Sequence, residues 1–133
     1  MSDTDGYSSS SILWLYIKDF YPDITMKYIC HEHKAHGLED IIDEVEQCGF
    51  DLVLVPDAGS FDSEYYQRLE DVGTDCICID HHSADSYPTH CICVNNQLSE
   101  HYPNKSLCGA GVVYKFCQVL DKILCPQNPR SSY

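Results

Sequence analysis

The stretch TDCICIDHH, residues 74–82, decides the fold of this chain. Its first six residues are mostly β-branched or small and apolar, which predicts a short buried strand. Three polar residues, Asp80, His81 and His82, follow that strand directly. Side chains after the strands of an open α/β sheet lie at its carboxyl edge, where such sheets bind their ligands. Carboxylate and imidazole suit a transition metal such as manganese or zinc. A solvated polar loop is the alternative for so short a motif.

A second strand precedes this stretch and is expected to lie beside it. Residues 50–55, FDLVLV, form an almost continuous apolar run, as in a central parallel strand, and Asp57 follows the run. A helix expected over residues 62–71 then leads back to the strand before Asp80. Strand, helix and strand at this spacing predict a right-handed parallel crossover. Asp57 and the Asp80-His81-His82 tripeptide therefore leave the same edge of the sheet and can converge.

The remaining segments complete a three-layer α/β domain with a mainly parallel sheet of about four strands. Further strands are expected at residues 24–29 and 90–94, and further helices over 8–20, over 38–48 and from about 109 onward. The acidic turn at residues 3–6 carries Asp3 and Asp5, which can face one cation if the turn is tight; an acidic tail with a helix cap is the alternative. The small residues 109–111 at a helix start admit a phosphate to the backbone N–H groups, or only a close-packed helix entry.

Composition excludes several classes of protein. The 133 residues correspond to one domain, and contents of 44% hydrophobic and 22% charged residues are ordinary for a globular protein. No apolar run approaches the ~20 residues that a membrane span needs, and no signal peptide opens the chain. The formal charge of −13 argues against a broad nucleic-acid-binding face, because phosphate contacts need Lys and Arg. Phosphate chemistry on this chain would therefore depend on bound cations.

Nine cysteines, an odd number, indicate reduced thiols in the cytoplasm rather than a disulfide framework. Two Cys-Ile-Cys segments raise a zinc hypothesis, but thiols at this spacing share one face of a strand, and buried structural thiols are the favoured interpretation. Their cysteines are Cys76, Cys78, Cys91 and Cys93. Three histidines at 31, 33 and 36 lack the i, i+4 spacing of helical zinc sites and favour a polar loop near the active cleft.

Four motifs together carry a family resemblance. They are Asp3-Thr4-Asp5-Gly6, Asp57-Ala58-Gly59-Ser60, Asp80-His81-His82 and Cys108-Gly109-Ala110-Gly111-Val112. In order and spacing they resemble the DHH phosphoesterase family over almost the whole chain, and RecJ-type single-strand exonucleases and their phage relatives are the most similar members. The resemblance implies a metal-dependent phosphodiesterase that acts on single-stranded nucleic acid and has no membrane partner.

The resemblance also implies roles for individual residues. The ligands of a centre of two manganese (or magnesium) ions would be Asp3, Asp5, Asp57 and His81, with Asp57 bridging. His82 and Asp80 would be catalytic, with His82 facing the scissile phosphate. From their place at a helix start, Gly109 and Gly111 are also expected to bind the substrate phosphate, together with His82.

The chain also departs from the family pattern. Members carry a strand before the first acidic turn and a later strand that ends in one more metal-binding aspartate; Asp121 lies inside the expected last helix and is a poor substitute. We therefore expect residues 1–133 to form a single partial catalytic domain, truncated at both ends. Two alternatives for function stay open: a phosphodiesterase for short oligonucleotides or cyclic dinucleotides, and a non-catalytic module.

Overall fold

Three parallel strands, β1 (Leu52–Pro56), β2 (Asp75–Asp80) and β3 (Ile92–Asn95), form the centre of the fold. The computed structural model describes residues 3–31 and 37–127. Within these residues the strand order is β1-β2-β3, so the sheet has three strands and not about four. β2 is the central strand and carries most of the buried strand residues, whereas β1, predicted to be central, lies at an edge.

The predicted strand at residues 24–29 is wrong. The segment is extended but pairs with no strand among the residues that the structure describes. It is held through side chains instead: Lys18 Nζ donates to the carbonyl of Ile24 at 2.8 Å, and Tyr28 packs edge-on against Trp14. Tyr28 therefore packs beside helix α1, whereas Ile29 packs against the core under α2 and α3, and both Ile24 and Tyr28 are about half exposed.

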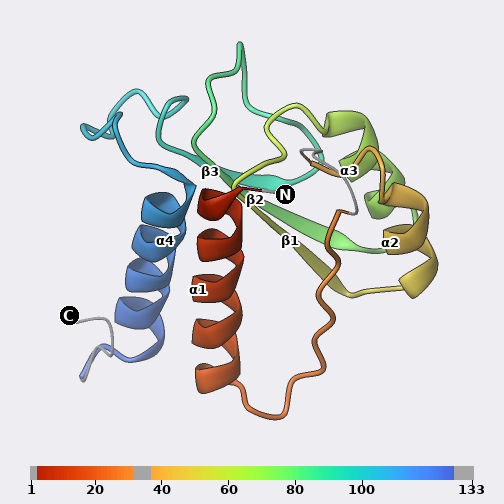
Figure 1. Ribbon diagram of the computed structural model, residues 1–133, viewed down its shortest axis with the longest axis horizontal. Coiled ribbons are helices and arrows are strands. Elements are labelled where there is room, and N and C mark those ends of the chain that lie inside the picture. The colour runs from red at the N-terminus through yellow and green to blue at the C-terminus, as the bar shows by residue number, and fades with distance from the viewer. Residues whose placement is uncertain (1–2, 32–36, 128–133) are drawn as a thin grey trace.

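Helices cover both faces of the sheet, which confirms the three-layer α/β fold (Figure 1). Helices α1 (Thr4–Phe20) and α4 (Gly109–Leu124) lie side by side on one face, where Leu13, Ile79 and Val113 form the core. Helices α2 (Ile42–Cys48) and α3 (Ser63–Asp71) cover the other face, over a second core that includes Tyr66, Leu69 and Cys78. None of the helices in residues 3–31 and 37–127 is both long and apolar enough to cross a membrane.

Two helices begin at other residues than predicted. α1 starts at Thr4 and not near residue 8, because the carboxylate of Asp3 caps it by accepting the N–H of Gly6 at 2.9 Å. The expected acidic turn is therefore the first turn of a helix. α2 starts at Ile42 and not at residue 38, because the N–H of Leu38 is bonded to the Asp62 side chain at 2.9 Å and is held in a preceding turn.

The carboxyl ends of the strands and the N-termini of α1 and α4 meet at one rim of the molecule (Figure 1). Asp57 directly follows β1, Asp80 is the last residue of β2 and Asn95 is the last residue of β3; Asp80 and Asn95 are partners in the parallel register. This rim brings the predicted site residues together.

Candidate metal centre

Asp57 lies at the centre of the rim in an uncommon backbone conformation. Its N–H extends the β1–β2 ladder by one bond, donating to Ile79 O at 2.7 Å, and its φ of 64° is in the left-handed region. Aspartate is one of the few residues that adopt this conformation at moderate cost. The turn it opens continues through Gly59, whose φ is 102° and whose carbonyl accepts the Tyr66 hydroxyl at 3.0 Å. The turn directs the Asp57 carboxylate inward, with only 3% of the residue exposed.

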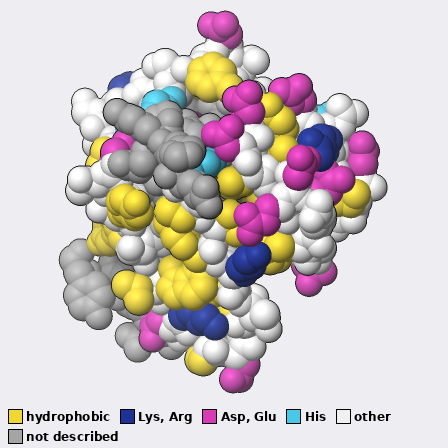
Figure 2. Space-filling view, turned by 45° about the vertical axis from the view of Figure 1, so that its right-hand side comes forward, with side chains coloured by type: hydrophobic (Ala, Val, Ile, Leu, Met, Phe, Trp, Pro, Cys, Tyr) yellow, Lys and Arg dark blue, Asp and Glu magenta, His cyan; other side chains and the backbone are white. Residues whose placement is uncertain are grey.

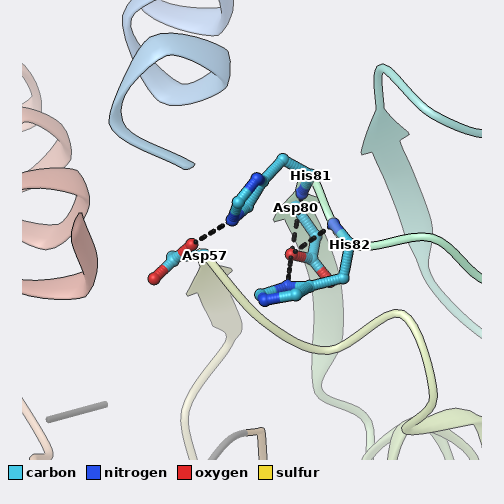
Figure 3. A group of neighbouring side chains, drawn as sticks. All are labelled: Asp57, Asp80, His81 and His82. Atoms are coloured by element: carbon cyan, nitrogen blue, oxygen red, sulfur yellow. Dashed lines mark hydrogen bonds and ion pairs between the residues drawn. The ribbon is translucent and has the colours of Figure 1, made fainter. Parts of the chain in front are cut away.

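His81 completes a convergence of three segments that are distant in sequence. Its Nε2 lies 3.1 Å from Asp57 Oδ1 and 3.5 Å from Asp5 Oδ2. Figure 3 shows the His81 ring directed at the Asp57 carboxylate, while His82 folds back onto Asp80. The loop after β2, the turn after β1 and the first turn of α1 therefore contribute one group each to the same small space.

Asp5 joins the N-termini of α1 and α4. Its two carboxylate oxygens accept the N–H groups of Gly109 at 2.7 Å and Ala110 at 2.9 Å, the donors that a helix leaves unpaired in its first turn. Burial would raise the pKa of Asp5, but the N–H donors of Ala110 and Gly109 outweigh burial and lower that pKa. Asp5 is therefore a fixed anion, and each oxygen keeps a lone pair for a second partner.

The charged form of Asp57 is destabilised by its surroundings. Burial raises its pKa to about 6, and the nearby charges of Asp5 and Asp3 add to the increase, against the opposing effects of His81 and His82. Asp57 Oδ1 is buried and forms no hydrogen bond in the described part of the chain, and His81 Nε2 approaches it at 3.1 Å as a possible ion-pair partner. A divalent cation would supply the missing partner and neutralise the repulsion, and carboxylate and imidazole are ligands that Mn²⁺ and Mg²⁺ accept. The residues present thus fit such an ion.

Asp80 differs from Asp57 in that its oxygens are already occupied. Oδ1 accepts from His81 N (2.7 Å), His82 N (3.3 Å) and His82 Nδ1 (2.6 Å). Oδ2 accepts from Ser60 N (3.2 Å) and Ser60 Oγ (2.7 Å). A carboxylate offers about four lone-pair sites, so these donors leave none for a metal. Asp80 therefore orients its neighbours, although ligand atoms of Asp57, Asp80, His81 and His82 all lie within 4.8 Å of one another.

The predicted site glycines have distinct environments. A Cβ on Gly109 would lie 2.1 Å from Asp57 Oδ1, so glycine is required there for close approach to the acid. Because the Gly109 N–H is bonded to Asp5, that group is not open to a phosphate in the way the sequence suggested. A Cβ on Gly111 would meet only the Leu107 side chain, at 3.1 Å. No described contact bears on a phosphate at Gly111, and that role stays a prediction.

Asp3 is the predicted ligand with the least direct support. One of its oxygens is used in the α1 cap, and its connection to Asp57 is through charge rather than contact. Asp121 lies within α4 as expected; it is fully buried and accepts the Tyr16 hydroxyl at 3.4 Å, away from the rim.

The other candidate metal motifs do not form a centre in the described residues. Cys76 and Cys78 are buried beneath α3, and Cys91 and Cys93 pack against the same core. Burial raises the pKa of Cys76 to about 11 and that of Cys91 to about 12, which keeps these thiols protonated and supports the packing interpretation. All nine cysteines are free. Most of the histidine loop, with His33 and His36, lies outside the described residues.

Sequence reasoning missed two polar residues at the rim, Ser60 and Asn95. Both are buried; Ser60 bonds to Asp80, and Asn95 bonds to the loop that carries the histidines. The available signal was position: like Asp57 and Asp80, Asn95 stands at the carboxyl end of a strand. Ser60 lies in one of the quoted motifs, but no local pattern indicated its contact with Asp80.

Comparison with known proteins gives consistent matches. The chain matches the model described as the DHH family, N-terminal domain, over residues 1–131. Over 125 residues it is 47% identical to the "Putative SPbeta prophage-derived single-strand DNA-specific exonuclease YorK" of Bacillus subtilis (strain 168) and to the "Putative single-strand DNA-specific exonuclease yorK" of Bacillus phage SPbeta. Each match covers 92% of this chain and 21% of the relative. The chain thus spans about a fifth of the length of these curated relatives.

Two solved structures resemble the fold. Exonuclease RecJ bound to manganese superposes with a TM-score of 0.80 and 25% identity, covering 96% of this chain and 33% of that one. RecJ from Thermus thermophilus in complex with Mn²⁺ gives a TM-score of 0.76 and 23% identity, covering 96% of this chain and 18% of that one. The α/β architecture therefore matches that of part of these two RecJ structures.

Replacing Asp57 by Asn should stabilise the metal-free protein and abolish its response to manganese. The folded-state pKa of about 6 lies above the ordinary 3.8, so the buried charge lowers stability progressively as pH rises from about 4 to 6, and the loss persists above pH 6. Asn removes that charge and tolerates the left-handed backbone. At pH 7.5 we expect a gain on the order of 1–3 kcal/mol without metal. Thermal unfolding in EDTA and in MnCl₂ measures both effects.

Asp71→Asn is the matched control, since Asp71 is an exposed acid on α3 and its loss should change neither reading. An Asp57→Asn protein that is no more stable in EDTA, and whose melting temperature still rises with Mn²⁺, would contradict the assignment of Asp57 as a strained ligand.

Replacing Gly109 by Ala should weaken Mn²⁺ binding, because the new methyl group would displace the Asp57 carboxylate. We expect a loss of about 10–100-fold, the usual effect of disturbing a group that supports a ligand. Gly111→Ala is the control: its methyl group meets only the flexible side chain of Leu107, so the affinity should stay near that of the wild type. Calorimetric titration with MnCl₂ compares the two, and equal affinities would refute the proposed contact.

Proposed function

This chain belongs to the DHH family, and from that membership and the geometry of its rim we propose that it is the catalytic part of a metal-dependent phosphodiesterase that hydrolyses single-stranded nucleic acid. The relatives named as single-strand DNA-specific exonucleases support the substrate class. Since the chain spans about a fifth of those relatives, their activity is proposed for it and not transferred as a property.

One observation carries the proposal: carboxylate oxygens of Asp5 and Asp57 both lie within 3.5 Å of His81 Nε2, and the three groups come from three separate segments. Two acids this close repel each other, and burial of Asp57 increases the cost of its charge. Such an arrangement lowers stability unless a cation occupies it, so its presence at the edge of an α/β sheet favours a ligand-binding role.

In the proposed centre, Asp5, Asp57 and His81 would hold a divalent ion, Mn²⁺ or Mg²⁺, and Asp3 is the further ligand that a second ion would need. When bound, such ions polarise a phosphodiester and lower the pKa of water. The protein itself holds the ligands: α4 fixes Asp5 through two N–H donors, and the β1–β2 ladder fixes Asp57.

His82 is proposed as the residue that faces the scissile phosphate. Its Nδ1 lies 2.6 Å from Asp80 Oδ1, and this contact orients the ring so that its other nitrogen could contact a nonbridging oxygen on which negative charge develops. Its ring lies 4.4 Å from that of His81, centroid to centroid, so a phosphate near His82 also lies near the metal ligands. Asp80 acts through His82 and His81 and is not itself in reach of the substrate.

The surface charge limits how the substrate binds. Acidic side chains spread over the face shown in Figure 2, with few basic ones among them. Several of the basic residues are engaged within the chain: Arg68 with Asp43 and Glu46, Lys27 with Glu44, and Lys105 with backbone carbonyls. Contact with phosphate would therefore rely on the metal ions, which reverse the local potential.

The purified chain with MnCl₂ and end-labelled oligonucleotides tests the proposal. We expect mononucleotides to be released from single strands, with no release in EDTA and little from a matched duplex. His82→Ala should lower kcat by about a hundredfold or more, because charge stabilisation in the transition state is lost. Glu100→Gln, an exposed change on the loop between β3 and α4, serves as control.

The alternatives give different results in the same assay. If dinucleotides or cyclic dinucleotides are cleaved and single strands are left intact, the chain is a phosphodiesterase, but its substrate is a short or cyclic nucleotide and not a single strand. If the chain neither binds Mn²⁺ nor hydrolyses any of these substrates, it is a non-catalytic module.

A further inference from the structure

A buried chain of hydrogen bonds runs from the end of β3 to the His82 ring. Asn95 Nδ2 donates to Ser60 Oγ at 2.9 Å, and Ser60 Oγ donates to Asp80 Oδ2 at 2.7 Å. Asp80 Oδ1 in turn lies 2.6 Å from His82 Nδ1, the contact drawn in Figure 3. Ser60, Asp80 and Asn95 are each at most 4% exposed, so bulk water does not compete for these bonds.

The direction of every bond in this chain is determined. Asn95 Oδ1 accepts the N–H groups of Gln97 (2.8 Å) and Leu98 (3.4 Å), which fixes its amide with the nitrogen toward Ser60. The Ser60 hydroxyl has one proton and gives it to Asp80, while its lone pair receives the Asn95 N–H. Backbone N–H groups, which can only donate, point at both oxygens of Asp80: Ser60 N at Oδ2 and His81 N and His82 N at Oδ1, so this carboxylate accepts at both oxygens. His82 Nδ1 must then carry a proton.

We propose that Ser60 and Asn95 are positioning residues that fix the tautomer and orientation of His82, with Nδ1 protonated and Nε2 as the nitrogen that meets the phosphate. The catalytic part of this inference rests on the proposed function. The positioning itself does not, because it concerns the state of a ring in the folded protein.

Asn95 holds the backbone of His82 as well as its ring. The second Nδ2 proton is donated to the carbonyl of His82 at 2.9 Å. One amide thus connects the end of β3, the turn after β1 and the loop after β2. Without the Ser60 hydroxyl, Asp80 Oδ2 would keep only the longer bond from Ser60 N at 3.2 Å, and the carboxylate would be fixed less firmly opposite His82.

Kinetic analysis of matched variants tests the catalytic part. Ser60→Ala and Asn95→Ala should lower kcat by about 10–100-fold with little change in KM or in Mn²⁺ affinity, as expected for groups that act through another residue. Ser60→Thr, which keeps the hydroxyl, should recover most of the lost kcat. If KM rises while kcat and the affinity for Mn²⁺ both fall, Ser60 and Asn95 have only a structural role, and the proposal is overturned.

The neighbouring residues provide controls. Asn96 is also buried, but its Nδ2 donates to Asn104 O and not to the His82 loop. Ser63 lies close to Ser60 in the chain, but its Oγ accepts from Thr89 N. Asn96→Ala and Ser63→Ala remove comparable bonds away from the hydrogen-bond chain, so their kcat should stay near that of the wild type. If they reduce kcat as much as the test variants do, the proposal is wrong.

NMR of the histidine ring nitrogens tests the positioning without an activity. In protein labelled with ¹⁵N-histidine, at a pH where the ring is neutral, His82 should give the pattern of the Nδ1–H tautomer. In folded Ser60→Ala or Asn95→Ala protein, we expect a mixture of the two tautomers. A wild-type ring in the Nε2–H form, or an unchanged pattern in both variants, overturns the proposal. If the wild type is inactive but its His82 ring gives the expected pattern, the proposed function is wrong and the inference about the positioning of His82 still holds.

Discussion

The buried carboxylate of Asp57 is the constraint on which the rest of the rim depends. It faces the charges of Asp5 and Asp3 with 3% of the residue exposed, and its pKa is raised to about 6 mainly by burial. A chain selected for stability alone would not keep a buried acid beside two like charges. If this acid is required, two neighbouring features are explained: the left-handed backbone that directs its carboxylate, and the glycine at 109 that leaves room for it.

The layered architecture explains how acids from distant segments reach the same place. Parallel strands present their carboxyl ends at one edge, and the two helices on one face begin at that edge as well (Figure 1). The positive end of a helix favours a carboxylate, and Asp5 occupies that position on α4 while belonging to α1. The same contact that joins the two helices therefore fixes a proposed ligand. Asp80 makes the corresponding connection between the strands, through Ser60 and Asn95.

The parts of this arrangement that could be predicted from the sequence are those with a local pattern. The apolar runs before Asp57 and Asp80 identified β1 and β2 and their shared edge, and the motifs identified the family. The segment at 24–29 has the alternation of a strand but no strand beside it in the described residues, and alternation alone does not reveal a partner. The start of α1 was misplaced because Asp3 was interpreted as part of an ion-binding turn, whereas it caps the helix. The contacts of Gly109 with Asp57 and of Asn95 with Ser60 join residues distant in sequence, so no local pattern could indicate them.

Anomalous X-ray scattering from crystals grown with MnCl₂, collected at the manganese edge, tests the central claim most directly. We expect a peak within bonding distance of the carboxylates of Asp5 and Asp57 and of His81 Nε2, and the disappearance of that peak in crystals of the Asp57→Asn variant. A map without a peak at this rim, or with manganese bound only at surface acids, would show that these three residues do not form a metal centre.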